Sequence, residues 1–212
     1  TRGTGKIFLF AGDQKIEHLN KDFYSSDRSI NHNQDDPRHL FSIASQAPIS
    51  FFAAHLGLIA HYGQEYSSVP YLVKLNGKTD LLTISHDDPL SELLVTIDQV
   101  VRFQKQSALS IPAVGYTIYL GSRYEARMLS QASQVIREAH QQGLMVVLWI
   151  YPRGVSVEHE RSADIIAGAA GVALSLGADF VKVNPPLELD DKTSAEQLKQ
   201  ATRAAGKTGV LC

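Results

Sequence analysis

Short apolar runs alternate along the chain with longer segments of helical periodicity, and this alternation constrains the fold more than any other feature. Seven runs have the length and apolar content of strands: residues 6–11, 49–54, 71–75, 113–119, 145–151, 179–183 and 209–212. Parallel strands need a crossover of a dozen or more residues between them, and a helix usually supplies it. The sequence therefore predicts an α/β protein with a parallel sheet and helical crossovers.

The clearest helical pattern lies over residues 124–142. Met128, Ala132 and Val135 fall on one face of a helix, and Gly143 stands where a helix commonly ends. Further helices are expected over residues 37–45, 88–104, 158–176 and 194–205.

Such a sheet can stay open and doubly wound, or it can close into a barrel. A doubly wound sheet usually binds a nucleotide through a glycine-rich first turn, but this chain has neither G-x-G-x-x-G nor G-x-x-x-x-G-K-[ST]. A barrel places its active site at the carboxyl ends of its strands. Polar, reactive side chains gather at those ends: Asp13, Glu17, His18, Lys74, Asn76, Tyr119, Tyr151, Arg153, Lys182 and Asn184.

We therefore predict a (β/α)8 TIM barrel in a single domain spanning residues 1–212. Only seven strands are visible, and the 212 residues fall short of the roughly 250 that are usual for this fold. We expect the C-terminal part, comprising the end of strand seven and strand eight, to be missing from the chain.

Composition and charge exclude several classes of function. The formal net charge is -2 and the basic residues are scattered, so we expect neither a nucleic-acid nor a membrane partner. No apolar stretch reaches the ~18 residues of a membrane span. Cys212 is the only cysteine, which permits no intrachain disulfide and fits a cytoplasmic location. The eight histidines form no metal-binding motif; we expect no metal, and expect His32, His39, His86 and His159 to be solvated.

Lys182 is the strongest single indication of chemistry. Alternation along its strand puts Phe180, Lys182 and Asn184 on one face and Val181 and Val183 on the other. In a barrel the valine face meets the helices, so the lysine points into the interior. Burial disfavours an ammonium and lowers its pKa, which supplies the neutral amine that attacks a carbonyl. The alternative is a lysine that pairs with an inward carboxylate for structure alone.

Asp13, Glu17 and His18 follow the first strand. An aspartate in that place can carry protons or hold a substrate hydroxyl, but it can also cap a helix or order a loop. Glu17 and His18 can equally be surface loop residues.

Three further strand-end residues have both a functional and a structural interpretation. Tyr151 can donate or accept a proton, and Arg153 can hold an anionic group bidentately, or the two can form an aromatic rim and a surface ion pair. Lys74 is a second candidate amine, or a charge that lowers the pKa of Lys182, or half of an ion pair with Asp13 or Glu17. We favour a supporting role for Lys74.

Taken in order, the strand-end motifs resemble those of one enzyme family. They are GDQKIEH at residues 12–18, KLNGKT at 74–79, GYTIY at 115–119, WIYPRG at 149–154 and GADFVKVN at 177–184. The chain resembles the archaeal-type class I fructose-bisphosphate aldolases and their bacterial DhnA-like relatives, a group adjoining the DeoC/LacD aldolases. The resemblance extends over essentially the whole chain.

The resemblance implies a Schiff-base aldolase that reversibly cleaves fructose 1,6-bisphosphate. It implies that Lys182 forms the imine, that Tyr151 transfers protons, and that Asp13 handles the substrate hydroxyl and carbinolamine steps. Substrate-binding residues are expected to be Trp149, Arg153, Lys74, His18 and Asn184. The resemblance further implies a phosphorylated sugar substrate, no cofactor and a homo-oligomer.

Two departures leave the substrate open. Gln14 stands where many relatives carry histidine, and Leu19-Asn20 stands where they carry Gly-Pro. The phosphate-binding glycine loops of the family follow strands seven and eight, and the chain stops before them. The alternatives are therefore a Schiff-base aldolase, transferase or thiolase for another phosphorylated ketose, or a non-catalytic barrel that binds a ligand.

Overall fold

The computed structural model describes residues 6–19, 36–81, 88–187 and 193–212. Its main sheet holds seven strands in the order β1-β2-β3-β6-β7-β8-β9, and every neighbouring pair is parallel. The strands are β1 (Leu9–Ala11), β2 (Phe51–His55), β3 (Tyr71–Lys74), β6 (Ala113–Leu120), β7 (Met145–Pro152), β8 (Phe180–Lys182) and β9 (Gly209–Leu211). All seven predicted strands are thus present, and the main-sheet strands are adjacent in the order of the chain.

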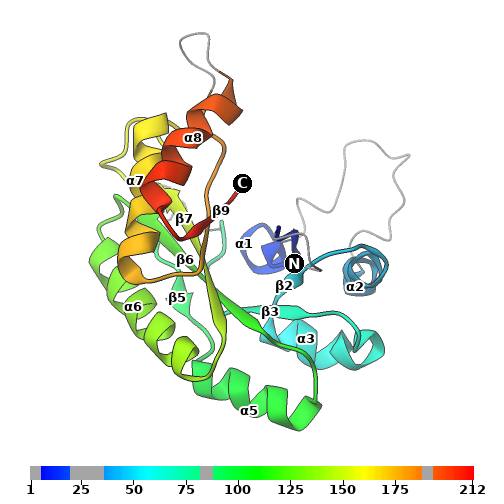
Figure 1. The fold of residues 1–212 in the computed structure, drawn as a ribbon. Coiled ribbons are helices and arrows are strands. Elements are labelled where there is room, and N and C mark those ends of the chain that lie inside the picture. Colours follow the sequence, from blue (N-terminus) through cyan, green and yellow to red (C-terminus); the bar gives the residue numbers. More distant parts are fainter. Residues whose placement is uncertain (1–5, 20–35, 82–87, 188–192) are drawn as a thin grey trace.

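The sheet curls, and its longer helices lie on the outer side, so the predicted TIM-barrel class is confirmed (Figure 1). The longer helices are α2 (Pro37–Gln46), α5 (Ile97–Ser107), α6 (Glu125–Gln141), α7 (Ala163–Leu176) and α8 (Ser194–Ala205). Three short helical elements were not predicted: α1 (Gln14–Glu17), α3 (Leu56–Tyr62) and the 3-10 helix η3 (Gly63–Tyr66). None of the helices in the described ranges combines the length and apolar character needed to cross a bilayer.

The helix predicted over residues 88–104 begins too early. Glu92–Leu93 (β5) pairs instead with Asn76–Gly77 (β4) in a two-stranded antiparallel sheet. The helix α5 begins after Thr96, because Thr96 and Gln99 form a capping box in which each side chain accepts a hydrogen bond from the backbone N–H of the other. The capping box therefore sets the start of the helix, although the apolar periodicity extends further upstream.

The helix predicted from residue 158 also begins too early, since α7 starts at Ala163 with Ser162 as its N-cap residue. The side chain of Arg161 donates a hydrogen bond to the carbonyl of Pro185. The backbone N–H of Leu187 donates to the carbonyl of Arg161. These contacts tie the segment before α7 to the loop after β8, outside any helix.

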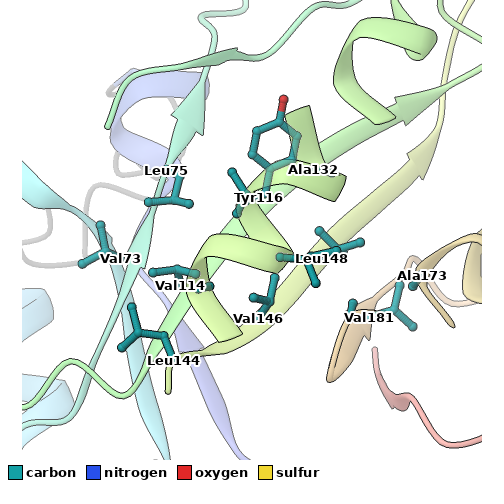
Figure 2. Close-up of a cluster of buried hydrophobic side chains, with 14 of the residues drawn as sticks. Val73, Leu75, Val114, Tyr116, Ala132, Leu144, Val146, Leu148, Ala173 and Val181 are labelled. Atoms are coloured by element: carbon teal, nitrogen blue, oxygen red, sulfur yellow. The ribbon is translucent and has the colours of Figure 1, made fainter. Parts of the chain in front are cut away.

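Alternation along the strands divides the core into two clusters. The outer cluster lies between sheet and helices and includes Val73, Val114, Leu148 and Val181 (Figure 2). The inner cluster fills the concave side of the sheet and consists of Phe51, Ala53, Leu72, Ala113, Val147 and Trp149. Full burial of a side chain as large as valine, leucine or phenylalanine stabilises the fold by about 1.5–3 kcal/mol. The inner cluster forms the floor below the strand ends, where the polar residues lie.

Candidate active site

A pocket of about 230 Å³ opens at the carboxyl ends of the strands. All eight residues predicted to catalyse or bind substrate line it: Asp13, His18, Lys74, Trp149, Tyr151, Arg153, Lys182 and Asn184. Ala11, Gln14, Glu17 and Thr117 complete the lining. Strand register explains this convergence, because Trp149 pairs with Lys182 across β7 and β8, and Tyr119 pairs with Tyr151 across β6 and β7.

The side chain of Lys182 points into the pocket as the alternation of its strand predicts, while Val181 and Val183 are buried in the outer cluster. Its Nζ donates a hydrogen bond to the Tyr151 phenol oxygen at 3.3 Å. Among the described residues, no carboxylate lies within ion-pair distance of this amine. Burial lowers the pKa of Lys182; the Asp13 carboxylate opposes that shift and the Lys74 ammonium adds to it.

Lys74 has a carboxylate partner. Its Nζ donates to Asp13 Oδ2 at 3.2 Å, and only 5% of the Lys74 side chain and 11% of the Asp13 side chain are exposed. Burial alone would raise the pKa of Asp13, but the charge and hydrogen bond of Lys74, together with smaller effects of His55 and Lys182, hold that pKa below its ordinary value. Asp13 also occupies the N-cap position of α1, but its side chain makes no capping bond there.

One indole ring lies beside both amines. The Nζ of Lys74 is 5.1 Å from the Trp149 ring centroid, and that of Lys182 is 6.0 Å from it. Gly115 makes room for this ring, because a Cβ at that position would approach the indole to 2.4 Å. The buried Trp149 ring therefore forms part of the pocket floor, next to both amines.

Tyr151 is placed to exchange protons with the amine of Lys182. Burial raises the pKa of its phenol, and the negative charges of Asp13 and Glu17 raise it further. The phenol therefore keeps its proton at neutral pH, and it can donate that proton to a group that becomes more basic during a reaction.

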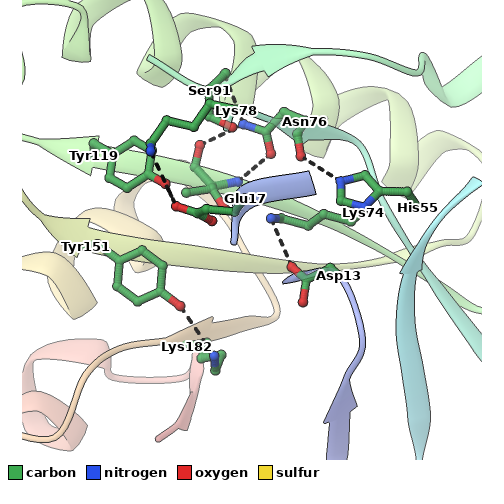
Figure 3. A network of polar contacts seen from close by, with 11 residues as sticks. Asp13, Glu17, His55, Lys74, Asn76, Lys78, Ser91, Tyr119, Tyr151 and Lys182 are labelled. Atoms are coloured by element: carbon green, nitrogen blue, oxygen red, sulfur yellow. Dashed lines mark hydrogen bonds and ion pairs between the residues drawn. The ribbon is translucent and has the colours of Figure 1, made fainter. Parts of the chain in front are cut away.

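A second polar group lies above the Lys182–Tyr151 pair (Figure 3). The phenol of Tyr119 donates to Glu17 Oε1 at 2.5 Å. Lys78 Nζ lies 3.8 Å from the same oxygen and 2.6 Å from Asp80 Oδ1. The Tyr119 ring also faces two cations, with Lys78 Nζ at 5.7 Å and Arg153 Cζ at 5.8 Å from its centroid.

Sequence reasoning missed three of these neighbours. His55 ends β2 and its Nε2 lies 3.4 Å from the carbonyl oxygen of Asn76. Burial lowers the pKa of His55, and Lys74 lowers it further, so the imidazole is neutral at pH 7. Thr117 lines the pocket, and Lys78 binds Glu17. Alternation could have indicated His55 and Thr117, since each lies two residues beyond an inward-facing residue of its own strand.

The remaining histidines and the residues after α1 were also the subject of predictions. His39 and His159 are exposed as predicted, whereas His32 and His86 lie outside the described residues, as does Asn20. Leu19 has a left-handed backbone, with φ of 54°. Within the described ranges, no three His, Cys, Asp or Glu side chains converge in a way that could hold a metal ion.

Residues 7–212 match the family described as "DeoC/LacD family aldolase". The chain is 53% identical, over its full length, to the "Fructose-bisphosphate aldolase/6-deoxy-5-ketofructose 1-phosphate synthase" of Methanocaldococcus jannaschii, and it covers 66% of that protein. The chain therefore spans just under two thirds of the length of this relative.

Solved structures give the same family. The fructose-bisphosphate aldolase from Slackia heliotrinireducens matches with a TM-score of 0.94 and 52% identity, over 100% of this chain and 66% of that one. An archaeal fructose-1,6-bisphosphate aldolase, "with the catalytic Lys covalently bound to the carbinolamine intermediate of the substrate", matches with a TM-score of 0.79 and 32% identity. That match covers 98% of this chain and 74% of the other.

Proposed function

The chain belongs to the DeoC/LacD family of aldolases, and on this premise we propose that it is a Schiff-base aldolase that reversibly cleaves fructose 1,6-bisphosphate. The observation that carries the proposal is Lys182, a partly buried amine with a lowered pKa, a phenol at 3.3 Å and no carboxylate within ion-pair distance among the described residues. An amine in this state is a nucleophile toward carbonyl carbon. The products of cleavage are dihydroxyacetone phosphate and glyceraldehyde 3-phosphate.

The reaction begins when the Lys182 amine attacks C2 of the open-chain ketose and forms a carbinolamine. Loss of water gives a protonated imine, and this imine takes up the electron pair of the C3–C4 bond as that bond breaks. The C4 hydroxyl gives up its proton, so the aldehyde leaves and an enamine stays on the lysine. Protonation of the enamine at C3 and addition of water release dihydroxyacetone phosphate and restore the amine.

Each remaining residue has a proposed role that follows from its place. Tyr151 transfers protons at the carbinolamine and the enamine, because its phenol is already hydrogen-bonded to the Lys182 amine. Asp13, held by Lys74, accepts a hydrogen bond from a substrate hydroxyl and assists the carbinolamine steps. Lys74 also favours the neutral form of Lys182.

Substrate binding is assigned to residues around these three. Trp149 packs beneath the carbon chain, and Arg153 binds an anionic group at the mouth of the pocket. His18 and Asn184, which also line the pocket, supply hydrogen bonds to the substrate. No cofactor is needed for this chemistry. A cytoplasmic location, a single domain and a homo-oligomer are parts of the same proposal.

A second candidate reaction is the formation of 6-deoxy-5-ketofructose 1-phosphate, because the relative with 53% identity carries both activities in its name. That compound has the same C1–C4 atoms as fructose 1-phosphate but a ketone at C5 and a methyl group at C6. Cleavage between C3 and C4 divides it into dihydroxyacetone phosphate and methylglyoxal. Both candidate reactions therefore use the same lysine imine and differ only in the aldehyde.

Borohydride trapping tests the proposal. The protein is mixed with dihydroxyacetone phosphate or fructose 1,6-bisphosphate, reduced, digested and mapped by mass spectrometry. We expect a covalent adduct on Lys182. An adduct on Lys74 would keep the chemistry and move the nucleophile to β3. The absence of an adduct with either compound would contradict the proposal and favour a transferase for another ketose or a non-catalytic barrel.

A further inference from the structure

We propose that Glu17 determines which aldehyde the enzyme accepts, by receiving a hydrogen bond from the hydroxyl group next to the aldehyde carbon. In fructose 1,6-bisphosphate this is the C5 hydroxyl, which becomes the C2 hydroxyl of glyceraldehyde 3-phosphate. The inference rests on the proposed function and extends it to the recognition of one half of the substrate.

The carboxylate of Glu17 is fixed in the pocket from two directions. Tyr119, fully buried at the end of β6, donates to its Oε1 at 2.5 Å, and Lys78 Nζ lies 3.8 Å from the same oxygen. The backbone carbonyl of Glu17 accepts a further hydrogen bond from the N–H of Asp80. Lys78 is held in turn by Asp80 at 2.6 Å. The two contacts of Oε1 and the hydrogen bond to the backbone of Glu17 together hold the carboxylate in one orientation toward a ligand.

Burial makes the Tyr119 contact persistent. The pKa of this phenol lies above its ordinary value because of burial and the neighbouring Glu17 charge. Tyr119 therefore stays a donor at neutral pH. Because the Tyr119 proton is donated to Glu17, it is not available to the substrate. The substrate is therefore recognised by the remaining acceptor positions of the Glu17 carboxylate.

The chemistry of a carboxylate selects the group that can lie against it. An ionised carboxylate only accepts hydrogen bonds, so it favours a hydroxyl and disfavours a ketone or a phosphate. Glu17 shares the pocket with Lys182, which bonds to C2. On the C1 side of C2 the substrate offers only a phosphate. The hydroxyl groups lie on the other side of C2. The C3 hydroxyl stays with the dihydroxyacetone phosphate half, the C4 hydroxyl gives up its proton when the C3–C4 bond breaks, and the C5 hydroxyl is the donor that the aldehyde half keeps.

The two candidate aldehydes differ at this very atom. Glyceraldehyde 3-phosphate carries a hydroxyl at C2, and methylglyoxal carries a ketone there. In either condensation the enamine C3 attacks the aldehyde carbon, the C=O electron pair becomes an alkoxide, and the alkoxide takes a proton. Bond making is therefore the same for both aldehydes, which differ in the phosphate at C3 and in the group at C2. Glu17 favours the aldehyde with the hydroxyl at C2, independently of any group that binds the phosphate.

Glu17→Gln tests the inference with almost no change in shape. Its amide oxygen can still accept from Tyr119, while its NH2 group can donate to the ketone of methylglyoxal. We expect the ratio of kcat/KM for glyceraldehyde 3-phosphate to that for methylglyoxal, with dihydroxyacetone phosphate as donor, to fall at least about tenfold. Trapping of dihydroxyacetone phosphate on Lys182 should stay at the wild-type level.

Two further variants complete the experiment. Glu65→Gln is the matched control, because Glu65 is an exposed residue of η3 that pairs with Arg38; its ratio should equal that of the wild type. Tyr119→Phe keeps the ring between Lys78 and Arg153 but removes the donor to Glu17, so the ratio should fall by a smaller factor. This variant decides the question if Glu17→Gln fails to fold.

The outcomes separate the inference from the function on which it rests. A trapped adduct together with an unchanged aldehyde ratio in Glu17→Gln and Tyr119→Phe would overturn the role of Glu17 alone. A loss that appears in trapping of dihydroxyacetone phosphate would place Glu17 on the other half of the substrate and overturn it too. No adduct in the wild type would overturn the proposed function and the inference together.

Discussion

The ends of β3 and β8 each bring a lysine to the same indole ring, but their surroundings differ. Lys74 is nearly fully buried and has the Asp13 carboxylate 3.2 Å from its Nζ. Lys182 is partly exposed, and its hydrogen-bond partner is the phenol of Tyr151 at 3.3 Å. Both amines lose hydration on folding, yet only at β3 does an opposite charge compensate for the loss.

Because of this difference, we propose different roles for the two amines. Lys74 and Asp13 form a buried ion pair, and the positive charge of Lys74 lies close enough to act on Lys182. Burial lowers the pKa of Lys182, since the Tyr151 phenol supplies no compensating charge; Asp13 opposes this shift and Lys74 adds to it. In the proposed mechanism, burial and the charge of Lys74 together favour the neutral, nucleophilic form of Lys182.

The largest expected effect is that of Lys182→Met, which keeps an unbranched side chain as far as Cε and removes the amine. Because a nucleophile cannot be replaced by its neighbours, we expect kcat for fructose 1,6-bisphosphate cleavage to fall at least about 10⁴-fold. Circular dichroism should show an unchanged fold. Lys74→Met is the matched variant and should still yield a borohydride adduct on Lys182. Substantial turnover by Lys182→Met would reverse the assignment of the two lysines.

Tyr151→Phe removes the only hydrogen-bond partner of Lys182 that the described residues provide, while keeping the ring. Proton transfer by a positioned group contributes about 10²–10⁴-fold to a rate, so we expect kcat to fall about 10²–10³-fold. The imine should still form and be trapped, because the amine is present. Rapid-quench measurement of adduct and product separates the two steps. An undiminished kcat would remove Tyr151 from the mechanism.

The sequence predicted the strands and the inward direction of Lys182 because both depend on local alternation. Val181 and Val183 are apolar enough to show which face meets the helices, and the structure confirms that face. The starts of α5 and α7 were wrong because they depend on hydrogen bonds rather than periodicity. Thr96 and Gln99 form a cap in one case, and Arg161 binds a distant carbonyl in the other.

The partners inside the pocket were harder to predict than its lining. Which carboxylate pairs with Lys74 was left open between Asp13 and Glu17, since both follow β1 within six residues. In the structure Asp13 pairs with Lys74, whereas Glu17 contacts Tyr119 and Lys78. Such choices depend on distances between segments far apart in the chain, and periodicity within one segment carries no information about them.

Lys74→Met sharpens the comparison through pH. Burial lowers the pKa of Lys182 and the Lys74 ammonium adds to that shift; in the proposed reaction only the neutral amine attacks the carbonyl. Without that ammonium the pKa of Lys182 rises, so the pH of half-maximal imine formation should move upward and the rate at pH 7 should fall roughly tenfold. Initial rates of adduct formation across pH measure this. Lys199→Met, an exposed change on α8, should leave the profile in place; an unmoved profile in Lys74→Met would show that burial alone tunes Lys182.

Asp13→Asn tests the other half of the ion pair through stability. The folded-state pKa of Asp13 lies below its unfolded value of about 3.9. Its ion-pair contribution is therefore fully present above that unfolded pKa and is lost as the pH falls through the folded pKa. At pH 7 we expect Asp13→Asn to lower the free energy of unfolding by on the order of 3 kcal/mol.

The difference between wild type and Asp13→Asn should begin to shrink as the pH falls below about 4, where the carboxyl of the unfolded chain takes up a proton. It should disappear once the pH lies below the lowered folded-state pKa of Asp13. Urea denaturation at pH 7 and pH 3 measures both differences. Asp98→Asn is the control, since Asp98 pairs with Arg102 on the exposed surface of α5 and such a pair contributes little at either pH. A difference for Asp13→Asn that is equal at both pH values would mean that Lys74 does not lower the pKa of Asp13. The contrast between a paired and an unpaired lysine would then have to rest on Lys182 alone.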